Sequence, residues 1–134
     1  IAALPAPVVV PVHPRTRERL AQSGLRSELE AIPQIVLTEP LGYGEFGSLL
    51  YHARAVATDS GGVQKEAYLA GVRCVTLRAN TEWVETVSAG WNTLVDLDAE
   101  KARAAIEAEP PAARPQLYGD GRAAERCVAE IDAL

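Results

Sequence analysis

The feature that most constrains this chain is a strand, a tight glycine turn and a helix within residues 57–67. An apolar segment ends at Thr58, two glycines follow at Gly61 and Gly62, and apolar side chains then recur at helical spacing. Such a turn points free backbone N–H groups and the positive end of a helix at a ligand, commonly phosphate. The glycines let the ligand approach closely because they carry no Cβ. We therefore expect an anion site over both glycines, with the Ser60 hydroxyl at the capping position.

Glu66 makes this expected site more specific. It lies four residues after Gly62, on the same face of the helix and one turn further along. A carboxylate would repel a phosphate that touched it, whereas beside a ribose it accepts hydrogen bonds from the diol. Diphosphate on the turn and ribose at Glu66 together describe a nucleotide. The alternative is an ordinary capped helix of an α/β domain, and the turn alone leaves both interpretations open.

Five short apolar segments alternate with helical patterns along the 134 residues. The expected strands are residues 8–12, 35–38, 55–58, 72–77 and 91–96. Strands without polar alternation are typical of a sheet covered on both faces. Repeated strand–helix units predict one α/β domain with a parallel sheet and right-handed crossovers. One of the helices is expected to open at Thr81, and residues 1–7 are interpreted as the end of a helix and a proline-bounded link.

Two further residues lie near the carboxyl ends of expected strands, where open α/β sheets bind ligands. His13 follows the first strand and precedes Pro14, which suits the first turn of a helix that ends at Gly24. A lone histidine is more often structural, and only its position favours a functional role. Phe46 follows the second strand, with Tyr43 nearby. These rings would either stack on a base or fasten a helix to the sheet.

The composition excludes several classes of function. The net charge is −5 and no basic stripe offsets a phosphate backbone, so no nucleic-acid partner is expected. No apolar run approaches the roughly 20 residues of a membrane helix and no signal peptide is evident, so no membrane partner is expected. Because no metal-ligand spacing, GxGxxG fingerprint or Walker A motif occurs, no cofactor or metal is expected. Cys74 and Cys127 are interpreted as small core residues, which suits a reducing cytoplasm.

Five motifs follow one another along the chain. They are His-Pro-Arg-Thr at 13–16, Pro-Leu-Gly-Tyr-Gly-Glu-Phe at 40–46, Asp-Ser-Gly-Gly-Val-Gln-Lys-Glu at 59–66, Thr-Glu-Trp-Val-Glu at 81–85 and Gly-Asp-Gly at 119–121. In this order they resemble the carboxy-terminal half of the non-hydrolysing UDP-N-acetylglucosamine 2-epimerases, over essentially the whole chain. The resemblance implies a Rossmann-like, three-layer domain spanning residues 1–134. In that family two such domains face each other across a cleft, as in GT-B glycosyltransferases, and this half holds UDP.

The resemblance also implies roles for individual residues. Ser60 and Gly62 correspond to ligands of the diphosphate, Glu66 to the ribose ligand, Phe46 to an aromatic position beside the uracil, and His13 to a cleft histidine that contacts phosphate and is needed for activity. The family's reaction interconverts UDP-GlcNAc and UDP-ManNAc. The C2 proton is removed, UDP is eliminated to give a 2-acetamidoglucal, and UDP is added back after protonation of the opposite face.

The sequence departs from the family pattern at two places. Trp83 and Val84 stand where many members have Arg-Pro, which removes one guanidinium from the phosphate end and leaves the exact sugar open. Pro14 stands where many members have arginine after the cleft histidine. That histidine–arginine pair is associated with allosteric binding of a second UDP-GlcNAc, so this regulation is not expected here.

The family's acidic residues for proton transfer at C2 lie mostly in an amino-terminal domain outside this chain. We therefore expect the chain to be inactive alone, and its partners to be a UDP-sugar, that domain, and a second copy in a cytoplasmic homodimer. One alternative is the donor-binding half of a GT-B glycosyltransferase, which would not need the motifs at 81–85 and 119–121. The other is a stand-alone nucleotide-sugar binding module, which would show a polar face where the missing domain docks.

Overall fold

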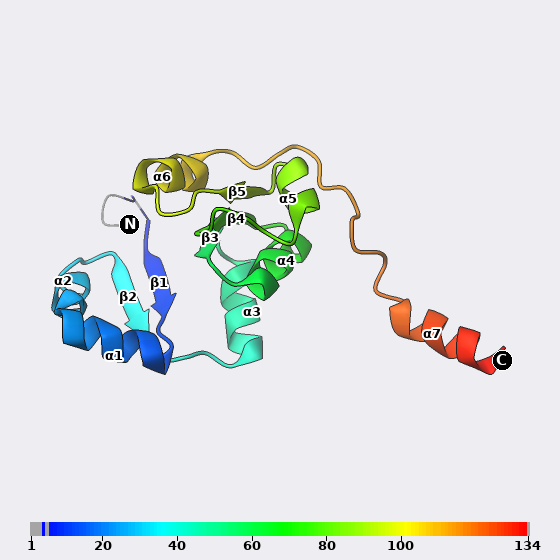
Figure 1. Ribbon diagram of the computed structural model, residues 1–134, viewed down its shortest axis with the longest axis horizontal. Helices are drawn as coiled ribbons and strands as arrows, with labels where there is room; N and C mark the ends of the chain where they lie inside the picture. Colours follow the sequence, from blue (N-terminus) through cyan, green and yellow to red (C-terminus); the bar gives the residue numbers. More distant parts are fainter. Residues whose placement is uncertain (1–3, 5, 134) are drawn as a thin grey trace.

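The strands of the computed structural model match those expected from the sequence. They are Val8–Pro11 (β1), Ile35–Thr38 (β2), Ala55–Thr58 (β3), Arg73–Thr76 (β4) and Asn92–Leu94 (β5), and every pairing between them is parallel (Figure 1). These pairings confirm the expected α/β class. The structure describes residue 4 and residues 6–133, so the interpretation of residues 1–7 lies largely outside the described residues.

The strands form two sheets, where the sequence led us to expect one. β1 pairs with β2, with Val8 opposite Ile35 and Pro11 opposite Thr38, while β3, β4 and β5 pair in that order in a separate sheet. Among the described residues no strand joins β1 to β3. The expectation of one sheet is therefore wrong for this chain. Strand–helix alternation predicts the direction of the strands, but it does not predict which strand edges meet.

Seven helices are found among the described residues. They are α1 (Pro14–Ser23), α2 (Leu25–Glu30), α3 (Tyr43–Tyr51), α4 (Gly61–Ala70), α5 (Val84–Ser88), α6 (Ala99–Glu107) and α7 (Ala123–Asp132). Pro14 begins α1 and Gly24 ends it with a left-handed φ of 75°, as expected. α2, which follows directly, was not expected. α5 begins three residues later than expected because the hydroxyl of Thr81 accepts a hydrogen bond from the Trp83 N–H and holds this segment in a turn.

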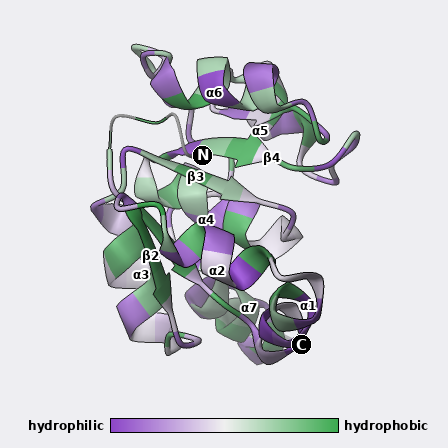
Figure 2. Ribbon diagram, turned by 90° about the vertical axis from the view of Figure 1, so that its left-hand side faces the viewer, coloured by the Kyte–Doolittle hydropathy of each residue, from purple (hydrophilic) through white to green (hydrophobic). Residues whose placement is uncertain are grey.

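The three-stranded sheet has an apolar core on each face, because Cys74 and Val75 of β4 point to opposite sides. One core contains Leu50, Ala67, Val72 and Cys74, with Phe46, Ala53, Val56 and Ala70 packed against it. The other contains Val75, Val95 and Ala105, with Ala102 and Ile106 packed against it. Figure 2 shows the strands, coloured mainly as hydrophobic, between α6 on one side and α4 on the other.

The segment that follows α6, residues 108–122, has no regular structure but is fastened to the body. Trp91 donates from Nε1 to the carbonyl of Ala113 at 2.9 Å, and the Tyr68 hydroxyl donates to the carbonyl of Pro115 at 2.6 Å. The Arg114 guanidinium donates to two carbonyls at the end of α4, both at 2.8 Å. These hydrogen bonds fix the path of the segment across the surface.

α7 lies away from both sheets (Figure 1). Its Val128 and Ile131 side chains are 56% and 67% exposed, and Cys127 is exposed as well. The expectation that Cys127 is a core residue is therefore wrong, whereas Cys74 is buried as expected. Helical spacing predicts which residues share a face, but it does not predict what covers that face.

No helix in the described part of the chain is long and apolar enough to cross a lipid bilayer.

Candidate functional site

The expected anion site is present as the start of α4, directly after β3. Ser60 caps the helix, and its Oγ accepts a hydrogen bond from the Val63 N–H at 3.5 Å. The Ser60 N–H in turn donates to Thr58 Oγ1 at 3.1 Å. Within residues 6–133 the N–H groups of Gly61 and Gly62 donate to no protein acceptor. Two free donors at the positive end of a helix are what an anion needs for binding.

The two glycines differ in how open they are to a ligand. A Cβ added to Gly61 would lie 3.0 Å from Glu82 Oε1 and 3.6 Å from Trp83 Nε1. A Cβ added to Gly62 would meet nothing nearer than Ser60 Oγ, at 3.8 Å. A ligand can therefore reach the backbone of the turn over Gly62, while Gly61 is covered by the segment that precedes α5.

Glu82 brings a negative charge to this covered side of the turn. A hydrogen bond from its own backbone N–H, and then its bond with Arg78, lower the pKa of the Glu82 carboxyl, so it is ionised at neutral pH. Arg78 Nη1 lies 3.1 Å from Glu82 Oε2 and compensates this charge. A diphosphate at the turn would therefore meet an ion pair rather than an isolated carboxylate.

Glu66 lies one turn further along α4, where the sequence predicts it. Its side chain is half-buried. No hydrogen bond or ion pair is found for its carboxylate among the described residues. A carboxylate in this position has all of its acceptor sites available to the hydroxyl groups of a ligand.

A buried polar network fastens α4 to the sheet beneath the turn. Gln64 Oε1 accepts from Thr81 Oγ1 at 2.6 Å and from Asn92 Nδ2 at 3.2 Å. Asn92 Nδ2 also donates to Thr86 Oγ1 at 3.2 Å, and Asn92 Oδ1 accepts from Thr76 Oγ1 at 2.7 Å. Sequence reasoning missed these residues. Gln64 and Thr81 belong to the motifs, but nothing in their spacing indicates that they meet.

Trp83, the residue that departs from the family pattern, lies against the first turn of α4. Its Nε1 donates to the carbonyl of Gly61 at 2.7 Å, and its ring stands edge-on to Tyr118 at 5.9 Å. Lys65 Nζ lies 4.7 Å from the centre of the Trp83 ring and 4.6 Å from that of Tyr118, a cation–π arrangement. A lysine ammonium therefore lies beside the first turn of α4.

Tyr118 connects the segment before α7 to this aromatic group. Its hydroxyl donates to Glu85 Oε1 at 2.8 Å. Burial, followed by the hydrogen bond and the charge of Glu85, raises the pKa of Tyr118 well above its ordinary value. The hydroxyl therefore remains a proton donor throughout the physiological range.

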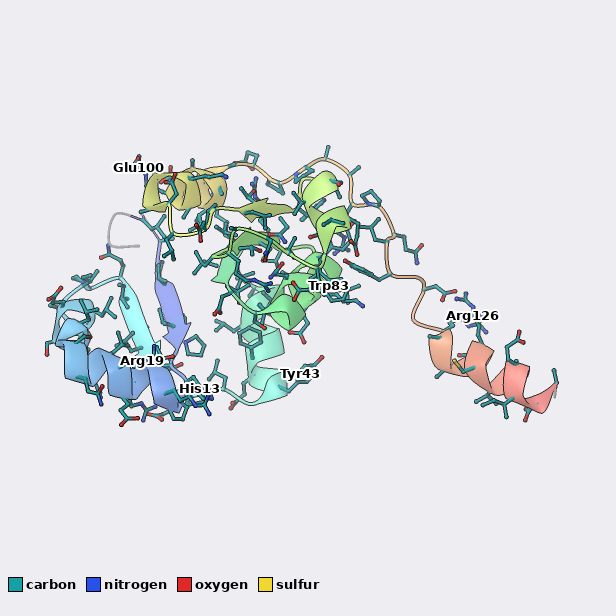
Figure 3. The ribbon with its side chains drawn as sticks, viewed as in Figure 1. His13, Arg19, Tyr43, Trp83, Glu100 and Arg126 are labelled. Atoms are coloured by element: carbon teal, nitrogen blue, oxygen red, sulfur yellow. The ribbon has the colours of Figure 1, made fainter. Side chains whose placement is uncertain are left out.

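His13 and Phe46, the other predicted site residues, lie on other elements. His13 caps α1, since its Nδ1 accepts a hydrogen bond from the Arg15 N–H at 3.3 Å, and its ring is exposed. Nε2 then carries the proton of the neutral ring. Phe46 is half-buried and packs on the core that includes Ala67, next to Glu66 in the sequence. Tyr43 is 83% exposed and lies with His13 at the lower edge of Figure 3.

The structure thus brings four of the predicted residues together on α4 and leaves two apart. No hydrogen bond or ion pair links His13 or Phe46 to the start of α4 within the described part of the chain. That part also contains no group of three or more His, Cys, Asp or Glu side chains arranged to hold a metal ion.

Comparison with known proteins agrees with the geometry. The family model for UDP-N-acetylglucosamine 2-epimerase matches residues 1–132. A UDP-N-acetylglucosamine 2-epimerase homolog of Methanococcus maripaludis is 45% identical over 123 residues, which are 90% of this chain and 34% of the relative. The UDP-2,3-diacetamido-2,3-dideoxy-D-glucuronate 2-epimerase of Pseudomonas aeruginosa is 46% identical over 125 residues, 90% of this chain and 33% of that enzyme.

A solved structure is similar in fold as well as in sequence. It is the UDP-GlcNAc 2-epimerase of Methanocaldococcus jannaschii in complex with UDP-GlcNAc and UDP, with a TM-score of 0.81 and 38% identity. The match covers 96% of this chain and 36% of that structure. The chain spans about a third of the length of the curated relatives that it matches. With a family model that matches nearly all of its residues, the chain belongs to the UDP-N-acetylglucosamine 2-epimerase family.

Proposed function

We propose that this chain is the UDP-binding part of a UDP-sugar 2-epimerase. The observation that carries the proposal is the start of α4, where the open backbone of Gly62 and the unpaired carboxylate of Glu66 lie one helical turn apart. This separation suits a ligand with an anionic group and a diol, as in a nucleoside diphosphate. The complex of the M. jannaschii epimerase with UDP and UDP-GlcNAc supports this choice of ligand.

Each group of the site, whether backbone or side chain, has a separate role in this proposal. The N–H groups of Gly61 and Gly62 donate to the diphosphate, and the helix start adds a favourable charge–dipole contact of roughly 0.3–1 kcal/mol. Glu66 accepts hydrogen bonds from the ribose hydroxyls. Phe46 lies beside the uracil, and His13 contacts the departing diphosphate. The last two roles rest on the motif resemblance, because no hydrogen bond or ion pair joins either residue to the start of α4 among the described residues.

The reaction that we propose takes place in a longer protein that contains this chain. A base removes the proton from C2 of a UDP-2-acetamido sugar, the C1–C2 double bond forms, and the C1–O bond to UDP breaks. Protonation of the opposite face of C2 and return of UDP to C1 give the epimer. The domain that supplies the acid and base, and a second copy in a homodimer, are the partners that we propose.

Calorimetric titration of UDP into Gly62→Val tests this placement of the diphosphate. The fold has room for the new Cβ, which would meet nothing nearer than 3.8 Å, so a loss of affinity reports the ligand contact. We expect Gly62→Val to bind UDP much more weakly than the wild type. Ser60→Ala should bind less tightly by about 1.5–3 kcal/mol, the usual value of one hydrogen bond to a charged group.

Gly47→Val is the matched control, since a Cβ on Gly47 in α3 also meets nothing within 4 Å. It should bind UDP as the wild type does. Equal affinities of the Gly62→Val and Gly47→Val proteins would rule out a diphosphate over the turn.

A further inference from the structure

The peptide group between Gly61 and Gly62 has its two ends on different sides of the turn. A trans peptide points its C=O and its N–H in opposite directions. The Gly61 carbonyl accepts a hydrogen bond from Trp83 Nε1 at 2.7 Å, on the side that the segment before α5 covers (Figure 3). The Gly62 N–H of the same peptide group therefore points away from Trp83, toward the free start of the helix, and Gly62 is exposed.

This peptide group is easily reoriented, because a glycine lies on each side of it. Glycine has no Cβ, so its backbone adopts conformations that other residues avoid. The first N–H groups of a helix also have no partner within the helix. Besides the hydrogen bonds within α4, the bond from Trp83 ties this peptide group to a neighbouring element of the described structure. Trp83 therefore favours the orientation in which the Gly62 N–H points outward.

Both backbone groups of Trp83 are in turn tied to the buried polar network. The Trp83 N–H donates to Thr81 Oγ1 at 3.0 Å, and its carbonyl accepts from Thr86 Oγ1 at 2.7 Å. Thr81 Oγ1 donates to Gln64 Oε1. Asn92 Nδ2 donates to both Thr86 Oγ1 and Gln64 Oε1, and Gln64 and Thr86 are completely buried. A closed circuit of hydrogen bonds thus joins the backbone of Trp83 to α4.

The indole ring of Trp83 is held by its neighbours as well. Lys65 Nζ lies 4.7 Å from the ring centre, and the Tyr118 ring stands edge-on, at 88° to the indole plane. An indole fixed through its backbone and its ring keeps Nε1 directed at the Gly61 carbonyl in the absence of ligand. The turn is therefore preorganised, so a ligand does not have to order it on binding.

We propose that Trp83 is a positioning residue for the diphosphate: its indole N–H holds the Gly61 carbonyl so that the Gly62 N–H points at the phosphate oxygens. This role rests on the proposed function, which supplies the diphosphate. Trp83 acts through the peptide group, since it lies on the covered side of the turn. Hydrogen bonds in a chain polarise one another, so donation to the carbonyl also makes the Gly62 N–H a stronger donor.

Trp83→Phe tests this role, because it removes the indole N–H and keeps an aromatic ring beside Lys65 and Tyr118. Without the hydrogen bond the peptide spends part of its time in orientations that do not bind phosphate, and the affinity falls in proportion. We expect UDP and pyrophosphate to bind about two- to tenfold more weakly, the range that one neutral hydrogen bond allows. Binding of uridine, which has no phosphate, should be unchanged. NMR titration of the chain measures all three affinities.

Trp91→Phe is the matched control. Trp91 Nε1 also donates to a backbone carbonyl, that of Ala113 at 2.9 Å, but in the segment that follows α6. Urea denaturation of both variants separates a loss of stability from a loss of binding, and Trp91→Phe should bind UDP as the wild type does. Three results would overturn the role of Trp83: equal UDP affinities of Trp83→Phe and the wild type, an equal loss in Trp91→Phe, or a loss as large for uridine as for pyrophosphate.

The wild-type chain allows a second measurement, which does not depend on the folding of a variant. Phosphate bound to the Gly62 N–H strengthens the hydrogen bond at the other end of the peptide group. The indole N–H resonance of Trp83 should therefore move downfield with UDP and with pyrophosphate, while that of Trp91 stays in place. A shift of the Gly62 amide without one at Trp83 contradicts the role of Trp83 and leaves the proposed function standing. No shift at Gly62 contradicts both.

Discussion

At the scale of single residues, Gly62 and Glu66 serve the proposed site in opposite ways. Gly62 contributes because it lacks a side chain, so a ligand can reach the backbone N–H groups of the turn. Glu66 contributes a carboxylate to which no described residue donates a hydrogen bond. A substitution at Gly62 therefore blocks access to the site, whereas a substitution at Glu66 removes one recognition contact and leaves access unchanged.

Glu66 can be tested by comparing two replacements. Glu66→Ala should weaken UDP binding by about 1.5–3 kcal/mol, because a hydrogen bond to a charged group is lost. Glu66→Gln keeps one acceptor and should retain much of the affinity. The measurement is calorimetry with UDP and with its 2′,3′-dideoxy analogue, and Glu100→Ala, at the distant start of α6, is the control (Figure 3). If the wild type binds both nucleotides equally, Glu66 does not bind the ribose.

Residues that begin or end a helix through nearby backbone groups were the most predictable ones. Ser60 caps α4 and Gly24 ends α1 as expected, because each acts on backbone groups within three residues of itself. Gln64 was not predictable in the same way. Its partners Thr81 and Asn92 are 17 and 28 residues away, and only the fold brings their side chains together.

At the scale of helices and strands, the sequence predicts periodicity, and periodicity does not determine burial. α3 and α7 both carry an apolar stripe. Leu50 of α3 is 5% exposed in a core, whereas Ile131 of α7 is 67% exposed. All five strands could be predicted from their apolar residues, but the division into two sheets could not, because it depends on which strand edges pair in the fold.

The difference between these helices predicts two different responses to the same kind of truncation. Leu50→Ala should lower the free energy of unfolding by about 2–5 kcal/mol, since it leaves a cavity in a packed core. Ile131→Ala should change it by no more than about 0.5 kcal/mol, as is usual for an exposed position. Urea denaturation followed by circular dichroism measures both. A large loss in the Ile131→Ala protein would mean that α7 packs on the body in solution.

At the scale of the whole molecule, the reaction that we propose has two sides, and we propose that the chain holds one of them. Epimerisation at C2 needs a base on one face of the sugar and an acid on the other. Among the predicted site residues of this chain, His13 is the one that we propose to lie near the departing diphosphate, where an imidazole suits proton transfer. One imidazole at the phosphate end does not serve both faces of the sugar ring.

The isolated 134 residues should therefore exchange no deuterium into C2 of a UDP-2-acetamido sugar in heavy water. Mass spectrometry of the recovered sugar measures the exchange. Adding the domain that we propose supplies the acid and base, in trans or in the same polypeptide, should restore it, and His13→Ala should then abolish it. Exchange catalysed by the isolated chain would show that both proton-transfer groups lie within it.

The hydrogen bonds between residues 108–122 and the rest of the structure limit how far α7 can move from it. The last fixed point is Tyr118, bonded to Glu85, and only residues 119–122 separate it from the helix. Gly119 and Gly121 within this stretch have left-handed φ of 76° and 81°. Four residues span at most about 14 Å when fully extended. Any surface of the same polypeptide that covers the apolar side of α7 must lie within that reach, where it meets the helix at an effective concentration in the millimolar range.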